Sequence, residues 1–177
     1  MSAVNPYAPP RAAVADVDEL SNEVQPVRMW SSQGRIGRLR FLAHMAGAYF
    51  LFGFLGVGVG AGLGGAGLRT LAMVVIGLGT IAYFVFIVFK FIQRSHDMDW
   101  SGWSVLLAII PLAGLVWVFK GGSAGANRFG GPPPANTLGV KILALIVPIT
   151  AVIGILAAIA LPAYSDYSKR ARQAQMK

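Results

Sequence analysis

Histidine and aspartate, residue types that often bind metals or move protons, come together in residues 93–103 of this sequence. There, His96, Asp97 and Asp99 could supply metal ligands, or a general base and the carboxylate that orients it. A metal site would need further ligands, and His44 is the only other histidine in the chain. We therefore expect no metal centre in this segment.

A structural network explains the same residues with fewer requirements. Arg94 could pair with Asp97 or with Asp99, and Ser101 and Gly102 would turn the chain toward the next segment. The sequence contains no H-E-x-x-H or Walker pattern. We accordingly predict no enzymatic activity, no catalytic residues and no cofactor.

The elements that must position these residues are apolar. Four continuous stretches approach or meet the roughly 20 residues that a helix needs to cross the bilayer core. They cover residues 41–62, 70–92, 103–119 and 142–162. Continuous runs of this kind predict helices rather than strands. The third stretch has only 17 residues and carries Pro111 at its middle, which would kink a helix. It is expected to span the membrane, with a re-entrant hairpin as the alternative.

Composition agrees with a membrane protein. Of the 177 residues, 55% are hydrophobic and 12% are charged, whereas soluble domains carry about 25% charged residues. The absence of cysteine excludes disulfides, thiolate metal sites and thiol chemistry. Four prolines and four acidic residues in residues 1–27 predict a disordered cytoplasmic tail.

The net charge of +8 is distributed as a topology signal. With four spans and both ends inside, 11 of the 15 Lys and Arg residues lie on the inner side, which favours cytoplasmic termini. Arg35, Arg38 and Arg40 directly precede the first stretch and are expected to contact lipid headgroups. A nucleic-acid partner is not expected, because the basic residues sit at membrane borders rather than on one solvent face.

Small residues recur within the first stretch. Gly53, Gly56, Gly60 and Gly64 follow one another at helical spacing. Such a face allows close helix packing in lipid, but glycine at this density also loosens the end of a helix, and both readings remain open. The four stretches contain no Asp or Glu, which argues against an ion-coupled transporter.

Three short motifs stand in order at the borders of the apolar stretches. They are GRIGRLRF at 34–41, RSHD at 94–97 with SGW at 101–103, and GANRFG at 125–130. Together they resemble the bacterial inner-membrane family called domain of unknown function 805, over roughly residues 28–134. The resemblance implies a small polytopic membrane protein without an established activity.

The resemblance also assigns residues to motifs. The family-motif loop would contain Arg94, His96, Asp97, Ser101, Gly102 and Trp103, and an outer-loop motif would contain Gly125, Asn127, Arg128 and Gly130. This chain departs from the family pattern at Asp99, where the pattern usually has glycine, and at Ser104, where it has a second aromatic residue. Neither departure threatens the expected fold.

The last apolar stretch resembles a second family. GILAAIALPAYSDY at 154–167, followed by a basic tail, is similar to the N-terminal helix of type IV pilins. The alignment places Val140 and Leu145 where pilins have their cleavage glycine and a glutamate, so the resemblance does not include the residues of pilin processing and assembly. A pilin helix runs outward from the cytoplasm, whereas four spans would run this stretch inward. A re-entrant third stretch would remove that conflict.

We therefore predict an all-α, polytopic helical membrane protein with four transmembrane helices. Its parts would be the tail at 1–27, a DUF805-like membrane domain at 28–134, and a pilin-like transmembrane helix with a basic tail at 135–177. It would cross the bacterial inner membrane several times and contact lipids, and a membrane-protein partner or a second copy would bind through the glycine-rich helix. The expected role is an accessory or assembly factor of the cell envelope, linked to type IV pilus or secretion machinery. The alternative is an oligomeric channel or small-solute transporter.

Overall fold

The computed structural model describes residues 23–110 and 112–175, and every regular element in that part of the chain is a helix. In chain order these are α1 (Arg38–Gly65), α2 (Arg69–Asp97), the 3₁₀ helix η1 (Gly102–Ile109), α3 (Leu115–Phe119) and α4 (Leu138–Gln175). The all-helical expectation is confirmed for these residues. Most of the expected N-terminal tail lies outside them.

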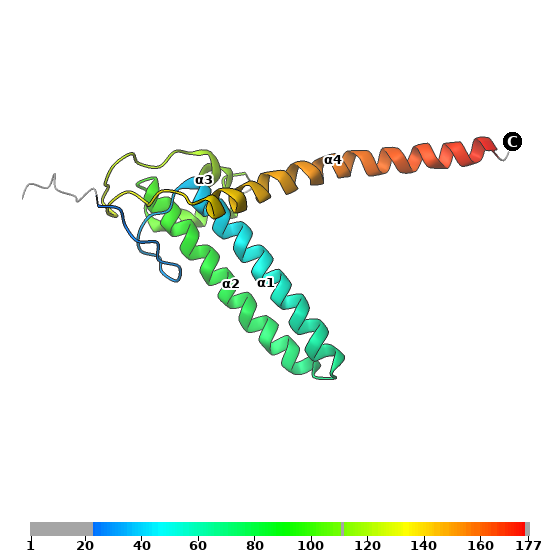
Figure 1. Cartoon of the computed structure of the whole chain (residues 1–177), viewed down its shortest axis with the longest axis horizontal. Coiled ribbons are helices and arrows are strands. Elements are labelled where there is room, and N and C mark those ends of the chain that lie inside the picture. Colours follow the sequence, from blue (N-terminus) through cyan, green and yellow to red (C-terminus); the bar gives the residue numbers. More distant parts are fainter. Residues whose placement is uncertain (1–22, 111, 176–177) are drawn as a thin grey trace, which may run out of the picture.

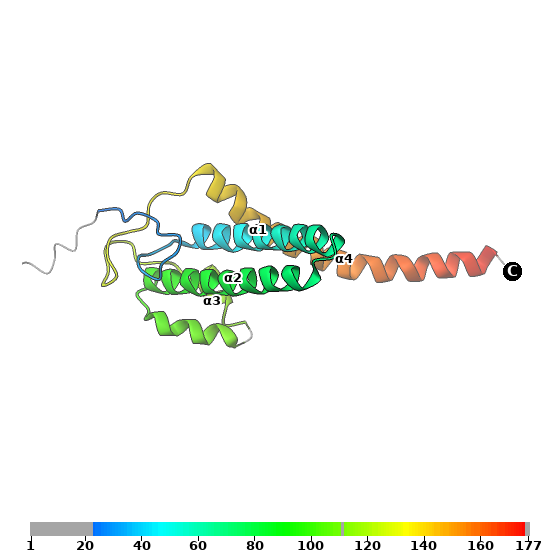
Figure 2. The same cartoon turned by 90° about the horizontal axis from the view of Figure 1, so that it is seen from below.

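Helices α1 and α2 form an antiparallel hairpin in which the two helices lie side by side (Figures 1 and 2). A tight turn at residues 66–68 joins them, and Gly67 adopts φ +80° there, a left-handed conformation that glycine adopts at little cost. Helix α1 continues to Gly65, so its glycine-rich end is helical in the structure. At the other end, which we call the open end, the start of α1 meets the end of α2.

Three helices in the described residues are long and apolar enough to cross a membrane: α1, α2 and α4. At 1.5 Å per residue, the 28 residues of α1 and the 29 residues of α2 each exceed the roughly 30 Å hydrocarbon core. Few side chains in the most apolar part of each helix are buried inside the protein. Surfaces of this kind are expected where lipid replaces water as the solvent.

The third apolar stretch does not form a continuous helix in the described residues, so the prediction of four spans is not confirmed. Its residues divide into η1 and α3, and the chain reverses between them, with Leu112 at φ +66°. Both arms return to the end of α2: Gly102 lies against Ile92, and the Trp117 carbonyl accepts a hydrogen bond from Arg94. Figure 2 shows this segment folded back beside α2. The re-entrant alternative matches this geometry, and Pro111 lies outside the described residues.

Helix α4 begins beside α1 and then leaves the hairpin. Ala144, in its second turn, is 1% exposed, and α4 packs against α1 alone among the long helices. Beyond this contact α4 projects away from the hairpin as a separate rod (Figure 1). Its apolar side chains there, such as Ile153, Leu156 and Ile159, are exposed.

The small buried core sits at the open end rather than between the long helices. Ile36, Phe41, Met98 and Trp117 form it, and they come from four different segments. Phe91 of α2 packs edge-on against both Phe41 and Trp117, with ring centroids 5.0 and 5.5 Å apart. This core supports the polar residues described next.

Candidate functional site

Asp97, the last residue of α2, is held by two arginines from different segments. Its Oδ1 accepts hydrogen bonds from Arg35 Nη2 at 3.1 Å and Arg35 Nε at 3.3 Å, and its Oδ2 accepts one from Arg94 Nη1 at 2.7 Å. The two arginine side chains are 0% exposed and the Asp97 side chain is 4% exposed. Both oxygens of the Asp97 carboxylate therefore accept hydrogen bonds from buried guanidinium groups.

Arg35 also binds the loop that carries the third motif. Its Nη1 donates to the carbonyls of Gly125 at 2.7 Å and Gly130 at 3.0 Å, and its Nη2 donates to the carbonyl of Ser123 at 2.9 Å. Arg35 was expected to contact lipid headgroups, and the structure instead buries it. The loop was expected on the outer side, opposite the first motif, and this geometry contradicts that placement.

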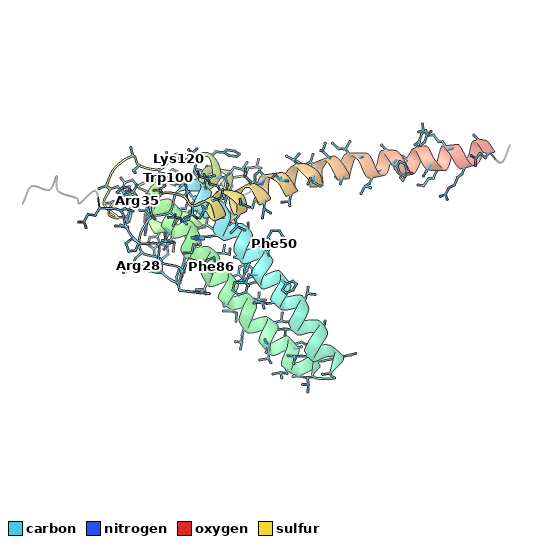
Figure 3. All side chains as sticks on the ribbon, viewed as in Figure 1. Arg28, Arg35, Phe50, Phe86, Trp100 and Lys120 are labelled. Atoms are coloured by element: carbon cyan, nitrogen blue, oxygen red, sulfur yellow. The ribbon has the colours of Figure 1, made fainter. Side chains whose placement is uncertain are left out.

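Arg94 likewise donates hydrogen bonds to backbone carbonyls, in and next to α3. Its Nε donates to the Trp117 carbonyl at 3.0 Å, and its Nη2 donates to the Lys120 carbonyl. The neighbouring Ser95 hydroxyl accepts from the Trp117 indole N–H at 2.8 Å. Figure 3 shows Arg35, Trp100 and Lys120 close together at the open end of the hairpin. We call the assembly of Arg35, Arg94, Asp97 and the carbonyls they bind the polar cap.

His96 is used for packing and backbone contacts. Its ring stacks on Phe129, with centroids 3.8 Å apart and planes 8° from parallel, and its Nδ1 lies 3.3 Å from the Gly34 carbonyl. Its own carbonyl accepts from Asn127 Nδ2 at 2.8 Å. No group of three His, Cys, Asp or Glu that could hold a metal occurs in the described part of the chain.

Asp99 lies outside the polar cap. It pairs with Arg128 at 3.2 Å on the surface, where both side chains are more than half exposed. Of the two expected partners of Arg94, the structure therefore selects Asp97. Asp99 adopts φ +58°, a conformation that favours glycine, which agrees with the glycine usual at this position of the family pattern.

Two buried residues of α2, Lys90 and Gln93, were not predicted from the sequence as part of the site. Gln93 donates to the carbonyls of Arg28, Ser31 and Gln33 at 2.8–2.9 Å, and Lys90 Nζ donates to the Arg28 carbonyl at 2.9 Å. They fasten residues 28–33 to the hairpin. The available signal was the presence of Lys and Gln near the end of an otherwise apolar stretch.

The segment before α1 is also anchored at its beginning. Gln25 donates from its backbone N–H to the Pro132 carbonyl at 3.2 Å and from Nε2 to the Phe129 carbonyl at 3.3 Å. Gln25, which was assigned to the disordered tail, therefore contacts the third motif.

Residues 121–125 read GGSAG, which fits the G-x-S-x-G pattern of hydrolase nucleophiles. That pattern needs a sharp turn from a strand to a helix, and here it lies in an irregular loop. The Ser123 hydroxyl accepts from Asn127 Nδ2 at 3.2 Å, and the nearby Asp97 carboxylate is already occupied. The arrangement therefore gives Ser123 no activating base.

The remaining predicted residues are dispersed. Ser101 caps η1 by accepting from the Trp103 N–H, and Trp103 is 80% exposed. Arg38 lies on the surface, where it donates to the Phe119 carbonyl. The polar cap therefore does not include Ser101 or Trp103.

The glycines of α1 make one close approach to α2. A Cβ on Gly60 would lie 3.7 Å from Ile76, whereas Gly53, Gly56 and Gly64 face open space. Gly53 and Gly56 line a cleft of about 430 Å³ between the two helices, and its walls are mostly apolar or aromatic. Such walls do not favour the passage of a polar solute.

Gly122 gives a direct test of the polar cap. A Cβ at this position would overlap the Asp97 carboxylate, while one at Gly121 would meet nothing within 4 Å. Overpacking of this kind costs about 1–3 kcal/mol. We expect Gly122→Ala to lower the thermal unfolding midpoint of the detergent-solubilised protein and Gly121→Ala to leave it nearly unchanged. Equal midpoints for the two variants would contradict the close approach of residue 122 to Asp97.

The three motifs thus meet at one place, although 62 residues separate Arg35 from Asp97 along the chain. The polar cap fixes loops and helices relative to one another. Its carboxylate and both guanidinium groups are paired with protein groups.

Comparison with known proteins agrees with the motifs. No curated protein and no solved structure matches the chain. A family model described as "Protein of unknown function (DUF805)" matches residues 29–131. The match includes all three segments of the polar cap and ends before α4, where the pilin-like stretch lies. Because the matched range covers more than half of the 177 residues, this chain belongs to the DUF805 family.

Proposed function

We propose that this protein is a non-enzymatic interaction protein of the bacterial inner membrane, in which α4 is the element that binds a partner. The observation that carries the proposal is the course of α4, which packs against α1 and then leaves the hairpin. A helix of 38 residues with exposed apolar side chains is available to another helix within the same membrane. The polar cap would fix the direction in which α4 leaves the protein.

The exposed part of α4 carries a face suited to helix association. Thr150, Gly154 and Ala158 are spaced by four residues, so they lie on one side of the helix. A Cβ on Gly154 would meet nothing within 4 Å. In lipid, small residues at this spacing let two helix backbones approach closely. The partner surface on this chain is therefore α4, in addition to the glycine-rich α1 favoured by the sequence.

An orientation with three spans agrees with the distribution of Lys and Arg along the chain. With the open end in the cytoplasm, 10 of the 15 Lys and Arg residues lie on the cytoplasmic side, nearly the asymmetry expected for four spans. Helix α4 would then run outward, as the N-terminal helix of a pilin does. This orientation supports type IV pilus or secretion machinery as candidate partners, and a second copy of the chain is the alternative.

Site-specific photo-crosslinking in native membranes tests the proposal. A photoreactive residue at Ala158 should yield a protein adduct, whereas one at Leu156, on the opposite side of the helix, should yield little. Gly154→Leu should abolish the Ala158 adduct, because the larger side chain keeps the backbones apart. Ile153→Leu, which adds no bulk on an adjacent position, should preserve it.

The mass of the adduct identifies the partner, since twice the mass of the chain indicates a second copy. Equal crosslinking from positions 156 and 158, or no protein adduct from position 158, would contradict a specific helix partner. In that case lipid alone would cover α4.

A further inference from the structure

Three basic residues meet in the hairpin close to its open end. Arg40 and His44 lie one turn apart on α1, and Lys90 lies on the neighbouring helix α2. Arg40 is 6% exposed and Lys90 is 0% exposed. The ring of Phe86 lies beside them, with Lys90 Nζ 5.0 Å and the His44 ring 6.2 Å from its centre. We call Arg40, His44 and Lys90 the basic cluster.

No carboxylate among the described residues pairs with the basic cluster. Lys90 donates to two neutral acceptors, the Arg28 carbonyl and Gln93 Oε1, both at 2.9 Å. Arg40 Nη2 donates to the Ala135 carbonyl at 2.9 Å. Among the described residues, the four ion pairs use Asp97, Asp99 and Asp166 and include no member of the basic cluster.

Two polar atoms of the basic cluster are buried without a hydrogen-bond partner among the described residues: Arg40 Nη1 and His44 Nδ1. Leaving a buried polar group unsatisfied is costly, and the cost is larger for a charged group. A buried cation without a counter-charge is costlier still. The geometry therefore calls for an acceptor that carries negative charge and approaches both side chains.

We propose that the basic cluster binds the phosphate group of an anionic membrane lipid. The cluster lies within the first two turns of α1 and the last two or three turns of α2, where a spanning hairpin passes from headgroups into hydrocarbon. Basic pockets between transmembrane helices at this depth suit lipid headgroups. Arg40 Nη1 would donate to a phosphate oxygen, and His44 would donate from Nδ1.

The surroundings favour a lipid over a free phosphate ion. Trp30 packs edge-on against Phe86 at 5.4 Å and is 58% exposed, and tryptophan is enriched at the membrane–water interface. Figure 3 shows Arg28 on the loop beside Phe86, near the open end of the hairpin. Only a phosphate that carries acyl chains would also gain from the apolar surfaces of α1 and α4. The site is independent of the partner proposed for α4.

Native mass spectrometry of the detergent-solubilised chain with added lipid tests the site. We expect one phosphatidylglycerol to bind at least about tenfold more tightly than phosphatidylcholine, because the choline cation of phosphatidylcholine offsets its phosphate charge and would be repelled by the basic cluster. Arg40→Gln should remove this preference. Arg38→Gln is the matched control, since Arg38 lies at the same membrane border on the surface and should leave the preference intact. His44→Leu, which keeps both cations, should weaken it and guards against misfolding of the Arg40 variant.

The outcomes separate the possible sources of phosphate. If millimolar inorganic phosphate displaces phosphatidylglycerol and binds in its place, the site belongs to a free ion and the lipid proposal is overturned. If Arg38→Gln reduces the preference as much as Arg40→Gln, surface charge alone attracts the lipid, and the basic cluster is not its site. Unchanged lipid binding in both the Arg40 and His44 variants would also overturn the proposal.

Discussion

Replacing Asp97 with asparagine is expected to destabilise the protein by about 3–5 kcal/mol, because the change leaves two buried arginines without a counter-charge. Asparagine keeps the shape of the side chain, so lost packing does not explain the effect. One amide oxygen remains as an acceptor, while the amide nitrogen would face a guanidinium that also only donates. The polar cap should then loosen at α3 and at the third-motif loop together.

Thermal unfolding in detergent measures this loss, and a fall in the midpoint on the order of 10 °C is expected. Asp99→Asn is the matched control, because Asp99 forms an exposed pair with Arg128, and exposed pairs contribute about 0–1 kcal/mol. An Asp97→Asn protein that unfolds like the wild type but loses a cellular function would contradict a structural role for the polar cap. It would instead support a chemical role for this carboxylate.

The length and hydropathy of the apolar stretches were sufficient to predict the three long helices. The first, second and fourth apolar stretches correspond to α1, α2 and α4. Their length and hydropathy are local properties of the chain, and the bilayer requirement is simple. The order of the motifs likewise indicated the family, and the family model confirms that assignment over residues 29–131.

The third stretch shows where hydropathy fails. A segment of 17 apolar residues is just long enough to cross the membrane as a helix. The same segment can also form a hairpin, provided that its backbone is buried against protein such as α2. The choice depends on contacts that no window of sequence contains, since Arg94 binds the carbonyls of Trp117 and Lys120. The left-handed backbone at Leu112 also could not be foreseen, because leucine rarely adopts it.

Arg35 and Arg38 illustrate the same limit within the site. Both are arginines shortly before the first span, and both were expected to contact lipid headgroups. The structure buries Arg35 against Asp97 and leaves Arg38 on the surface. A long-range partner distinguishes them, and a single sequence carries no direct record of that pairing. Arg94 and Asp97 were easier to link, because three residues separate them on one helix.

The side of the membrane on which the third motif lies is expected to reverse relative to a four-span protein. In the structure, Arg35 holds the carbonyls of Gly125 and Gly130, so residues before α1 and residues 120–130 must share one side. Four spans would separate them by the whole bilayer. The third motif must therefore lie either on the same side of the membrane as the first motif or on the opposite side, and the two models predict opposite results.

The most direct measurement of this claim is single-cysteine labelling, because the natural chain has no cysteine. Gln33→Cys, Ala124→Cys, Ala66→Cys and Gln173→Cys each place one thiol at an exposed position. A membrane-impermeant maleimide should label positions 66 and 173 in intact spheroplasts, and positions 33 and 124 only after permeabilisation. Labelling of position 124 together with position 66, and on the side opposite position 33, would contradict the convergence of the motifs at the polar cap.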